Sequence, residues 1–170
     1  MKMTMIVGNP KPLSKTFSFA EAALDALKQQ LAEQGEQEIE LVKIDLANYG
    51  TALVQWDQAV IADLIEQVAA SSYLVIASPT YKATYTGLLK LFLDILPMGA
   101  LHNKLVLPMM VGASPQHQLA VELHLKPVLA ELGAATMSKG LYLLDTQLEG
   151  CTELINEWMA GNKALIAAFR

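Results

Sequence analysis

Two lysines and two hydroxyl residues stand close together near the start of the chain: Lys11, Ser14, Lys15 and Thr16, with Asn9 just before them. They follow an apolar run, residues 3–7, that is typical of a buried strand, and a helical pattern begins at Thr16. The unpaired N–H groups and the positive end of the helix dipole therefore lie where these side chains cluster. Hydroxyls, ammonium groups and a helix N-terminus together suit a phosphate monoester.

The same segment has a purely structural interpretation, because Ser14 or Thr16 could simply cap the helix. Capped strand–loop–helix junctions occur in most α/β domains and usually bind nothing. The loop lacks the second glycine and the Lys-Ser or Lys-Thr of a P-loop, and it lacks G-x-G-x-x-G. Neither a nucleoside triphosphatase nor an ordinary Rossmann dehydrogenase is indicated.

Two later loops could complete a binding site. Residues 79–87 follow an apolar run and offer a proline-stiffened backbone with two aromatic side chains, Tyr81 and Tyr85, that could flank a planar heterocycle. Residues 112–115 are small, so a ring edge could approach their backbone. In a doubly wound sheet, ligands bind beyond the carboxyl ends of the strands, near the switch in strand order. We therefore expect these two loops to lie beside the first one.

Alternating strand and helix patterns define the elements that carry these loops. We expect strands at residues 3–7, 39–44, 73–77, 105–111 and 136–144, and helices at residues 16–31, 57–71, 86–95, 116–132 and 151–170. Their alternation and short connections predict a single α/β domain, residues 1–170, with a doubly wound parallel sheet and helices on both faces.

Three features qualify this pattern. The strand at 39–44 alternates apolar and polar residues, as an edge strand does, and Pro108 weakens the prediction of the strand at 105–111 because proline deletes a ladder donor. Pro127 falls inside the fourth helix and predicts a kink or π-bulge within residues 122–127, near the mouth of the site or a subunit contact, with His124 turned toward it.

Composition excludes several classes of protein. The chain has 170 residues, 53% of them hydrophobic, and a net charge of −5, so a sizeable core is expected and a nucleic-acid partner is not. No segment has the length of a membrane span or the core of a signal peptide, which predicts a cytoplasmic protein without a membrane partner. The single cysteine, Cys151, is expected to be a filler rather than a nucleophile.

Three strings resemble motifs of the NADPH-dependent FMN reductases, particularly the sulfonate-assimilation branch: GNPKPLSKT from Gly8, SPTYKATYTGLLKLFLDILP from Ser78 and LHLKPVLAELGA from Leu123. The resemblance covers about residues 3–145, and the P-x-Y-x-x-x-Y-x-G-x-L-K-x-x-L-D string is its most specific part. It implies a flavodoxin-like fold with a five-stranded parallel sheet in the order 2-1-3-4-5.

The resemblance also implies an NAD(P)H-dependent flavin oxidoreductase that passes a hydride from NADPH or NADH to FMN. The cofactor carries that chemistry, so neither a catalytic side chain nor a metal site is expected. The first loop would hold the phosphate, the second the reactive edge of the flavin and the third its pyrimidine edge. The implied cofactor-binding residues are Asn9, Lys11, Ser14, Lys15, Thr16, Pro79, Thr80, Tyr81, Lys82, Gly112, Ala113 and His117.

Each role has a plainer alternative. Tyr81 and Tyr85 could pack a subunit interface, Lys82 could be solvated, Gly112 could make a turn, and His117 could be an exposed helix-start residue. Two other functions also stay open. The chain could be a reductase of quinones, azo compounds or metal oxyanions with fixed FMN, or a flavodoxin-type electron carrier, although such carriers are usually more acidic.

The sequence also predicts an oligomer, and at three positions it differs from the family it resembles. The segment 85–96 is apolar nearly all round, and by resemblance the helix from Gly87 builds a homodimer or homotetramer. A flavin-dependent monooxygenase is a candidate recipient of the reduced flavin. Asn9 and Lys11 stand where the family usually has serine and arginine, and Leu123 stands where the sulfonate branch often has a tyrosine. Without that tyrosine, we expect FMN to be retained more readily than in that branch.

Overall fold

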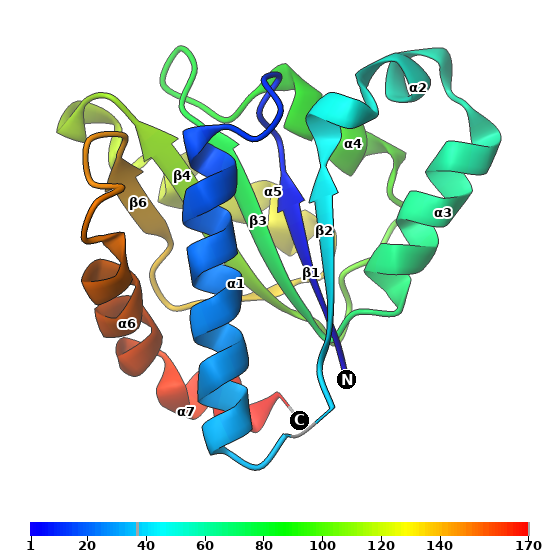
Figure 1. Ribbon diagram of the computed structural model, residues 1–170. Coiled ribbons are helices and arrows are strands. Elements are labelled where there is room, and N and C mark those ends of the chain that lie inside the picture. Colours follow the sequence, from blue (N-terminus) through cyan, green and yellow to red (C-terminus); the bar gives the residue numbers. More distant parts are fainter. Residues whose placement is uncertain (37, 170) are drawn as a thin grey trace.

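A parallel β-sheet forms the centre of the molecule, and helices cover both of its faces (Figure 1). The computed structural model describes residues 1–36 and 38–169. The strands within these residues are β1 (Lys2–Val7), β2 (Glu40–Asp45), β3 (Tyr73–Pro79), β4 (Leu105–Gly112), β5 (Ala135–Thr136) and β6 (Leu141–Leu144). They run in the order β2-β1-β3-β4-β5, with β6 also paired to β4, and every pair is parallel. The predicted order is confirmed, and β2 is an edge strand as expected.

The predicted fifth strand is divided into two pieces, which is a correction. β5 pairs with Leu105 and Val106, whereas β6 pairs with β4 only from Met109 onward. The N–H of Met137 donates to the carbonyl of Val106 over 3.2 Å, and the next donor in that ladder would be residue 108. Pro108 has no N–H, so the ladder stops there and resumes at Leu141. Pro108 thus interrupts the strand that pairs with β4 on the other side, dividing it into β5 and β6, while β4 itself stays continuously paired with β3.

Side chains of alternate strand residues build two cores. Met3, Met5 and Val7 of β1 lie in the core beneath the first, sixth and seventh helices, and Ile6 lies in the core on the other face. This alternation follows from the two-residue period of a strand. Both faces of the central strands are therefore buried, as the continuous apolar run at 73–77 predicts.

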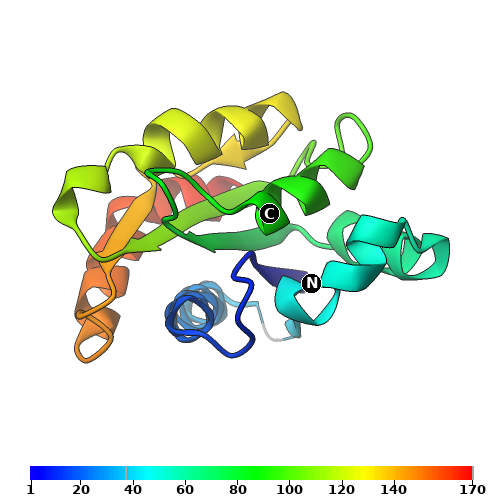
Figure 2. The same cartoon turned by 90° about the horizontal axis from the view of Figure 1, so that it is seen from above.

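The helices divide between the two faces (Figure 2). The first core lies under α1 (Lys15–Glu33), α6 (Cys151–Gly161) and α7 (Lys163–Ala168). The second lies under α3 (Gln58–Ala69), α4 (Gly87–Ile95), the π-helix η3 (Val121–Leu125) and α5 (Lys126–Glu131). Two short elements, η1 (Leu46–Asn48) and α2 (Gly50–Gln55), lie between β2 and α3, where no element was predicted.

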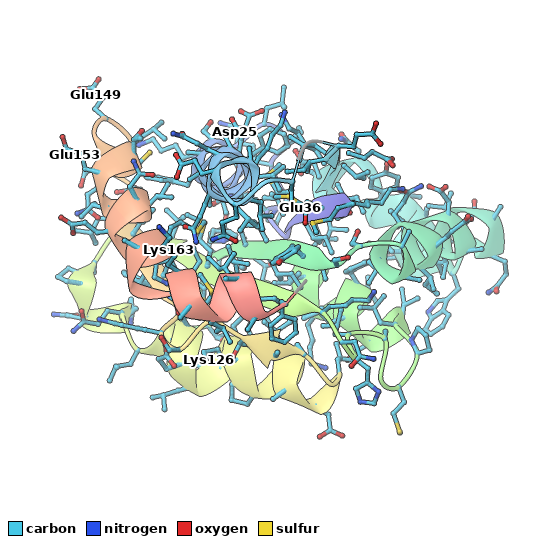
Figure 3. All side chains as sticks on the ribbon, turned by 90° about the horizontal axis from the view of Figure 1, so that it is seen from below. Asp25, Glu36, Lys126, Glu149, Glu153 and Lys163 are labelled. Carbon is cyan, nitrogen blue, oxygen red and sulfur yellow. The ribbon has the colours of Figure 1, made fainter. Side chains whose placement is uncertain are left out.

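Side chains cap the first three of the predicted helices. Ser14 caps α1, Asp57 caps α3 and Thr86 caps α4, each accepting a backbone N–H from the first turn. Seen from the opposite end of the sheet, Asp25 of α1 and Glu149 just before α6 project away from the core, whereas Lys163 of α7 lies beside a hollow that α1 residues also line (Figure 3).

The fourth and fifth predicted helices differ from expectation. The fourth begins as a separate 3-10 turn, η2 (Pro115–His117), and becomes the π-helix η3 before α5. The distortion predicted around Pro127 is thus confirmed. The last helix breaks at Asn162, whose side-chain oxygen accepts from the backbone N–H of Ser138 over 3.1 Å and from its hydroxyl over 2.9 Å.

Within residues 1–36 and 38–169, no helix is both long and apolar enough to cross a membrane.

Candidate flavin site

A pocket of about 490 Å³ opens at the carboxyl ends of β1, β3 and β4. It gathers the three predicted loops, which Figure 1 shows at the top of the sheet. Its lining residues are Asn9, Lys11, Leu13, Ser14, Lys15, Thr16, Pro79, Thr80, Tyr81, Val111, Gly112, Ala113 and Asp145. Every predicted cofactor-binding residue lies there except Lys82 and His117.

The start of α1 supplies hydrogen-bond donors to this pocket. Ser14 Oγ accepts the N–H of Phe17 over 3.3 Å, which leaves the hydroxyl hydrogen of Ser14 to donate elsewhere. The backbone N–H groups of Lys15 and Thr16 have no acceptor in the part of the chain that the structure describes. A 19-residue helix thus presents two free N–H groups and its positive dipole end to the pocket.

Two ammonium groups add positive charge. Neither Lys11 nor Lys15 forms an ion pair with a described carboxylate. Lys15 Nζ donates to the backbone carbonyl of Asp145 over 3.2 Å, so its side chain reaches from α1 to the segment after β6. An anion held here would meet two unpaired cations.

Asn9 braces the loop from within. Its Oδ1 accepts the N–H of Lys11 over 2.9 Å, and its Nδ2 donates to Thr16 Oγ1 over 3.3 Å. Since that bond uses Thr16 Oγ1 as an acceptor, the hydroxyl hydrogen of Thr16 stays available. Asn9 therefore orients the residues that face the pocket.

The second loop is a tight hairpin. Tyr81 and Thr84 exchange both backbone hydrogen bonds, at 2.9 and 3.2 Å, while Lys82 and Ala83 have φ of +50° and +65°. Positive φ at two successive residues is the geometry of a type I′ turn, which non-glycine residues adopt at a cost. The N–H of Thr80 donates to Val111 over 2.7 Å. The resemblance places the backbone of Thr80, Tyr81 and Lys82 at the reactive edge of the flavin; of their three N–H groups, that of Lys82 alone lacks an acceptor among the described residues.

Helix α4 fixes this hairpin to the first loop. The hydroxyl of Thr86 donates to the carbonyl of Gly8 and accepts the N–H of Leu89 over 3.1 Å. A Cβ on Gly8 would lie 2.4 Å from Leu89 Cβ, so glycine is needed for α4 to approach β1 this closely. The ends of β1 and β3 are thereby held in fixed register.

Tyr142 of β6 supports the third loop. Its hydroxyl donates to the carbonyl of Ser114 over 2.8 Å and fills the space beside Gly112. Burial raises the pKa of Tyr142, and the negative charge of Asp145 adds to the rise. Thr80 lies beside this hydroxyl, and its interaction with Tyr142 opposes the rise in pKa. Thr80 Oγ1 is buried in the pocket lining and has no partner at hydrogen-bond geometry among the described residues.

Two predicted residues lie outside the pocket, which is a correction. Lys82 is exposed at the tip of the hairpin, because its positive φ turns the chain away. His117 ends the 3-10 turn η2 and is held from the pocket by that turn. His124 is exposed on η3 and does not line the pocket, so of its two expected surroundings a subunit contact is the one that stays a prediction.

Sequence reasoning missed three lining residues, Leu13, Val111 and Asp145. Val111 and Asp145 lie at the carboxyl ends of β4 and β6. The carboxyl ends of parallel strands meet at one edge of the sheet, so the predicted strand ends could have identified both residues. Leu13 carries no signal, because an exposed leucine in a loop gives no indication of a binding role. Two larger hollows, of about 670 and 810 Å³, lie by the end of α1 and by the amino ends of β1 and β2, and contain none of the predicted residues.

Comparison with known proteins points in the same direction. The sequence model of the NADPH-dependent FMN reductase family matches residues 1–149. An "FMN reductase (NADPH)" from Escherichia coli (strain K12) is 32% identical over 151 residues, which cover 87% of this chain and 75% of that protein. An "NADH-dependent FMN reductase SfnF" from Pseudomonas putida is 24% identical, covering 84% of this chain and 76% of that protein. The apo crystal structure of an "NADH:FMN oxidoreductase (EMOB)" superposes with a TM-score of 0.83 and 30% identity, covering 96% of this chain and 89% of the other.

Proposed function

Because the chain belongs to the NADPH-dependent FMN reductase family, we propose that it binds FMN in the pocket of about 490 Å³ and reduces it with a hydride from NADPH or NADH. The observation that carries this assignment is the meeting of free donors and cations at the start of α1. Lys15 and Thr16 offer unpaired backbone N–H groups, and Lys11 and Lys15 offer ammonium groups without carboxylate partners among the described residues.

The residues present fit FMN. Ser14, Lys15 and Thr16 would hold the phosphate through hydroxyl and backbone donors, and Lys11 would add charge at the mouth. The buried, unpartnered Thr80 Oγ1 supplies a polar contact deeper in the pocket, and the exposed ring of Tyr81 offers a surface against which a flat ring system can pack.

The protein's part in the reaction is placement. When bound, the isoalloxazine ring supplies the hydride chemistry itself. The hairpin residue Tyr81 forms one wall of the pocket, and Tyr142 holds the Gly112–Ser114 segment at another. Thr86 and Gly8 keep these two walls in register through α4.

A second copy of the chain is the proposed partner of the α4 face. Leu89, Phe92 and Leu93 of α4 are buried against the sheet, whereas Met98 just beyond it is 93% exposed. Leu119 and Leu123, at the π-helix on the same face of the sheet, are also exposed. An apolar surface contributed by two neighbouring elements supports a homodimer or homotetramer.

Flavin titration and a coupled assay test the function. The purified protein is expected to bind FMN at micromolar concentration and to oxidise NADPH or NADH in its presence. Whether the protein is purified with bound flavin, and whether added FMN is needed for turnover, distinguishes a fixed cofactor from a substrate. Absence of FMN binding at micromolar concentration would contradict the assignment.

A further inference from the structure

A buried carboxylate stands directly behind the phosphate loop. Asp45, the last residue of β2, is only 5% exposed. Its Oδ2 accepts the backbone N–H of Leu13 over 2.9 Å, and its Oδ1 accepts that of Ala47 over 3.3 Å. Asp45 lies 32 residues from Leu13 in sequence, so this contact joins the edge strand to the loop after β1.

Leu13 has a conformation that its own residue type disfavours. Its φ is +48°, in the left-handed region, and its side chain is 79% exposed. A leucine gains nothing from this placement, because the left-handed region crowds its Cβ and the side chain packs against little. Such a backbone persists where its surroundings determine it, and the hydrogen bond to Asp45 is the contact that Leu13 makes through its backbone N–H.

The turn at Leu13 sets the entry of the chain into α1. Ser14, the next residue, is the N-cap, and the free N–H groups of Lys15 and Thr16 follow it. Asn9 fixes the other end of the loop through Lys11 and Thr16. Hydrogen bonds thus hold both ends of the loop that leads into the helix terminus at the pocket.

We propose that Asp45 is a positioning residue for the ligand phosphate: by holding Leu13 in the left-handed conformation, it gives the pocket its preference for FMN over riboflavin. This inference rests on the proposed function. Asp45 does not line the pocket; its bond to Ala47 caps η1, and Leu13 is the pocket-lining residue to which it is hydrogen-bonded. Its effect is therefore confined to the part of the ligand that the loop contacts.

The test compares dissociation constants for FMN and riboflavin in wild type and Asp45→Ala. A loop donor that no longer reaches the charged phosphate corresponds to about a tenfold or greater loss of FMN affinity, with less than about a threefold change for riboflavin. Glycine adopts positive φ freely. The FMN penalty of D45A should therefore shrink when it is measured in a Leu13→Gly background. Asp57→Ala, which removes the cap of α3, is the matched control and should leave the FMN-to-riboflavin ratio unchanged.

Equal weakening of both ligands, or the same penalty in both backgrounds, would overturn the inference. Should D45A fail to fold, Asp45→Leu replaces it, since leucine has a similar shape but accepts neither the Leu13 nor the Ala47 N–H; a wild-type ratio in D45L also overturns the inference. A wild type that prefers FMN, with variants that keep the preference, refutes this inference alone. A wild type that binds no FMN refutes the proposed function.

Discussion

The hydroxyl of Tyr142 occupies the space that a side chain at position 112 would need. A Cβ built on Gly112 would lie 1.9 Å from Tyr142 Oη and 2.9 Å from its Cζ. The same hydroxyl donates to the carbonyl of Ser114. Glycine at the end of β4 is therefore required by packing, and the third wall of the pocket depends on a residue of β6.

Gly112→Ala is expected to destabilise the fold by about 1–3 kcal/mol, because the new methyl group must displace a packed tyrosine. Adding Tyr142→Phe should recover part of this loss, since the closest atom is removed. Urea unfolding measures both variants. Gly161→Ala is the control, because a Cβ there has nothing within 4 Å, and an equal loss at Gly161 would contradict the packing explanation.

Ser14→Ala combined with Thr16→Ala should lower the affinity for FMN more than the affinity for riboflavin. Only FMN carries the phosphate that these hydroxyls are proposed to hold. Each lost bond to a charged acceptor costs about 1.5–3 kcal/mol. Fluorescence titration with both ligands provides the comparison. Ser18→Ala, on the same helix but outside the pocket lining, should change neither affinity. Equal weakening of both ligands would place the phosphate elsewhere.

Glu122→Gln should lower stability near neutral pH by about 1 kcal/mol and reduce its dependence on pH. Burial alone would raise the pKa of Glu122, but hydrogen bonds from Lys126 and from the N–H of Gly140 outweigh it, and the pKa is lowered from 4.5. A carboxylate with a depressed folded pKa stabilises the protein above its unfolded pKa, and this contribution is lost as pH falls through the folded pKa.

Thermal unfolding from pH 7 to pH 3 measures this effect. The wild type should lose more stability than E122Q as the pH falls below about 4.5, the ordinary value. Glu157→Gln is the control, because Glu157 forms no ion pair with any residue in the described ranges. Parallel stability curves for wild type and E122Q would contradict the prediction.

Sedimentation should show a dimer or tetramer at micromolar concentration, and Leu91→Glu on α4 should shift the protein toward monomer. A charge buried in an apolar contact is costly unless it is paired. Ala32→Glu, at an exposed position of α1 on the other face of the sheet, should leave the assembly unchanged. A monomeric wild type would count directly against the proposed contact.

FMN is expected to stay with the protein through dilution and dialysis. The expectation rests on Leu123, which is 66% exposed on η3 where the resembling branch often has a tyrosine. Leu123→Tyr should lower the flavin retained after dialysis, measured by absorbance, relative to Leu119→Tyr as a neighbouring control. Rapid loss of FMN from the wild type would refute the expectation.

The sequence by itself determined the elements and the edge of the sheet where the site lies. Continuous apolar runs such as 73–77 identify buried strands, and Ser14, Asp57 and Thr86 identify helix starts, because these signals lie within a few residues of one another. The first and third loops followed from the same local patterns. Even the π-helix near Pro127 was predictable, since a proline inside a helix must be accommodated locally.

Tertiary structure alone decided the features that depend on residues far apart in sequence. Pro108 divides the strand that pairs with β4, Asp45 fixes the backbone of Leu13, and Tyr142 accounts for Gly112. In each case one residue's missing or available hydrogen-bonding group, or the space it fills, constrains a partner about 30 positions away. Local periodicity carries no trace of such contacts, because they exist only once the sheet has brought distant strands side by side.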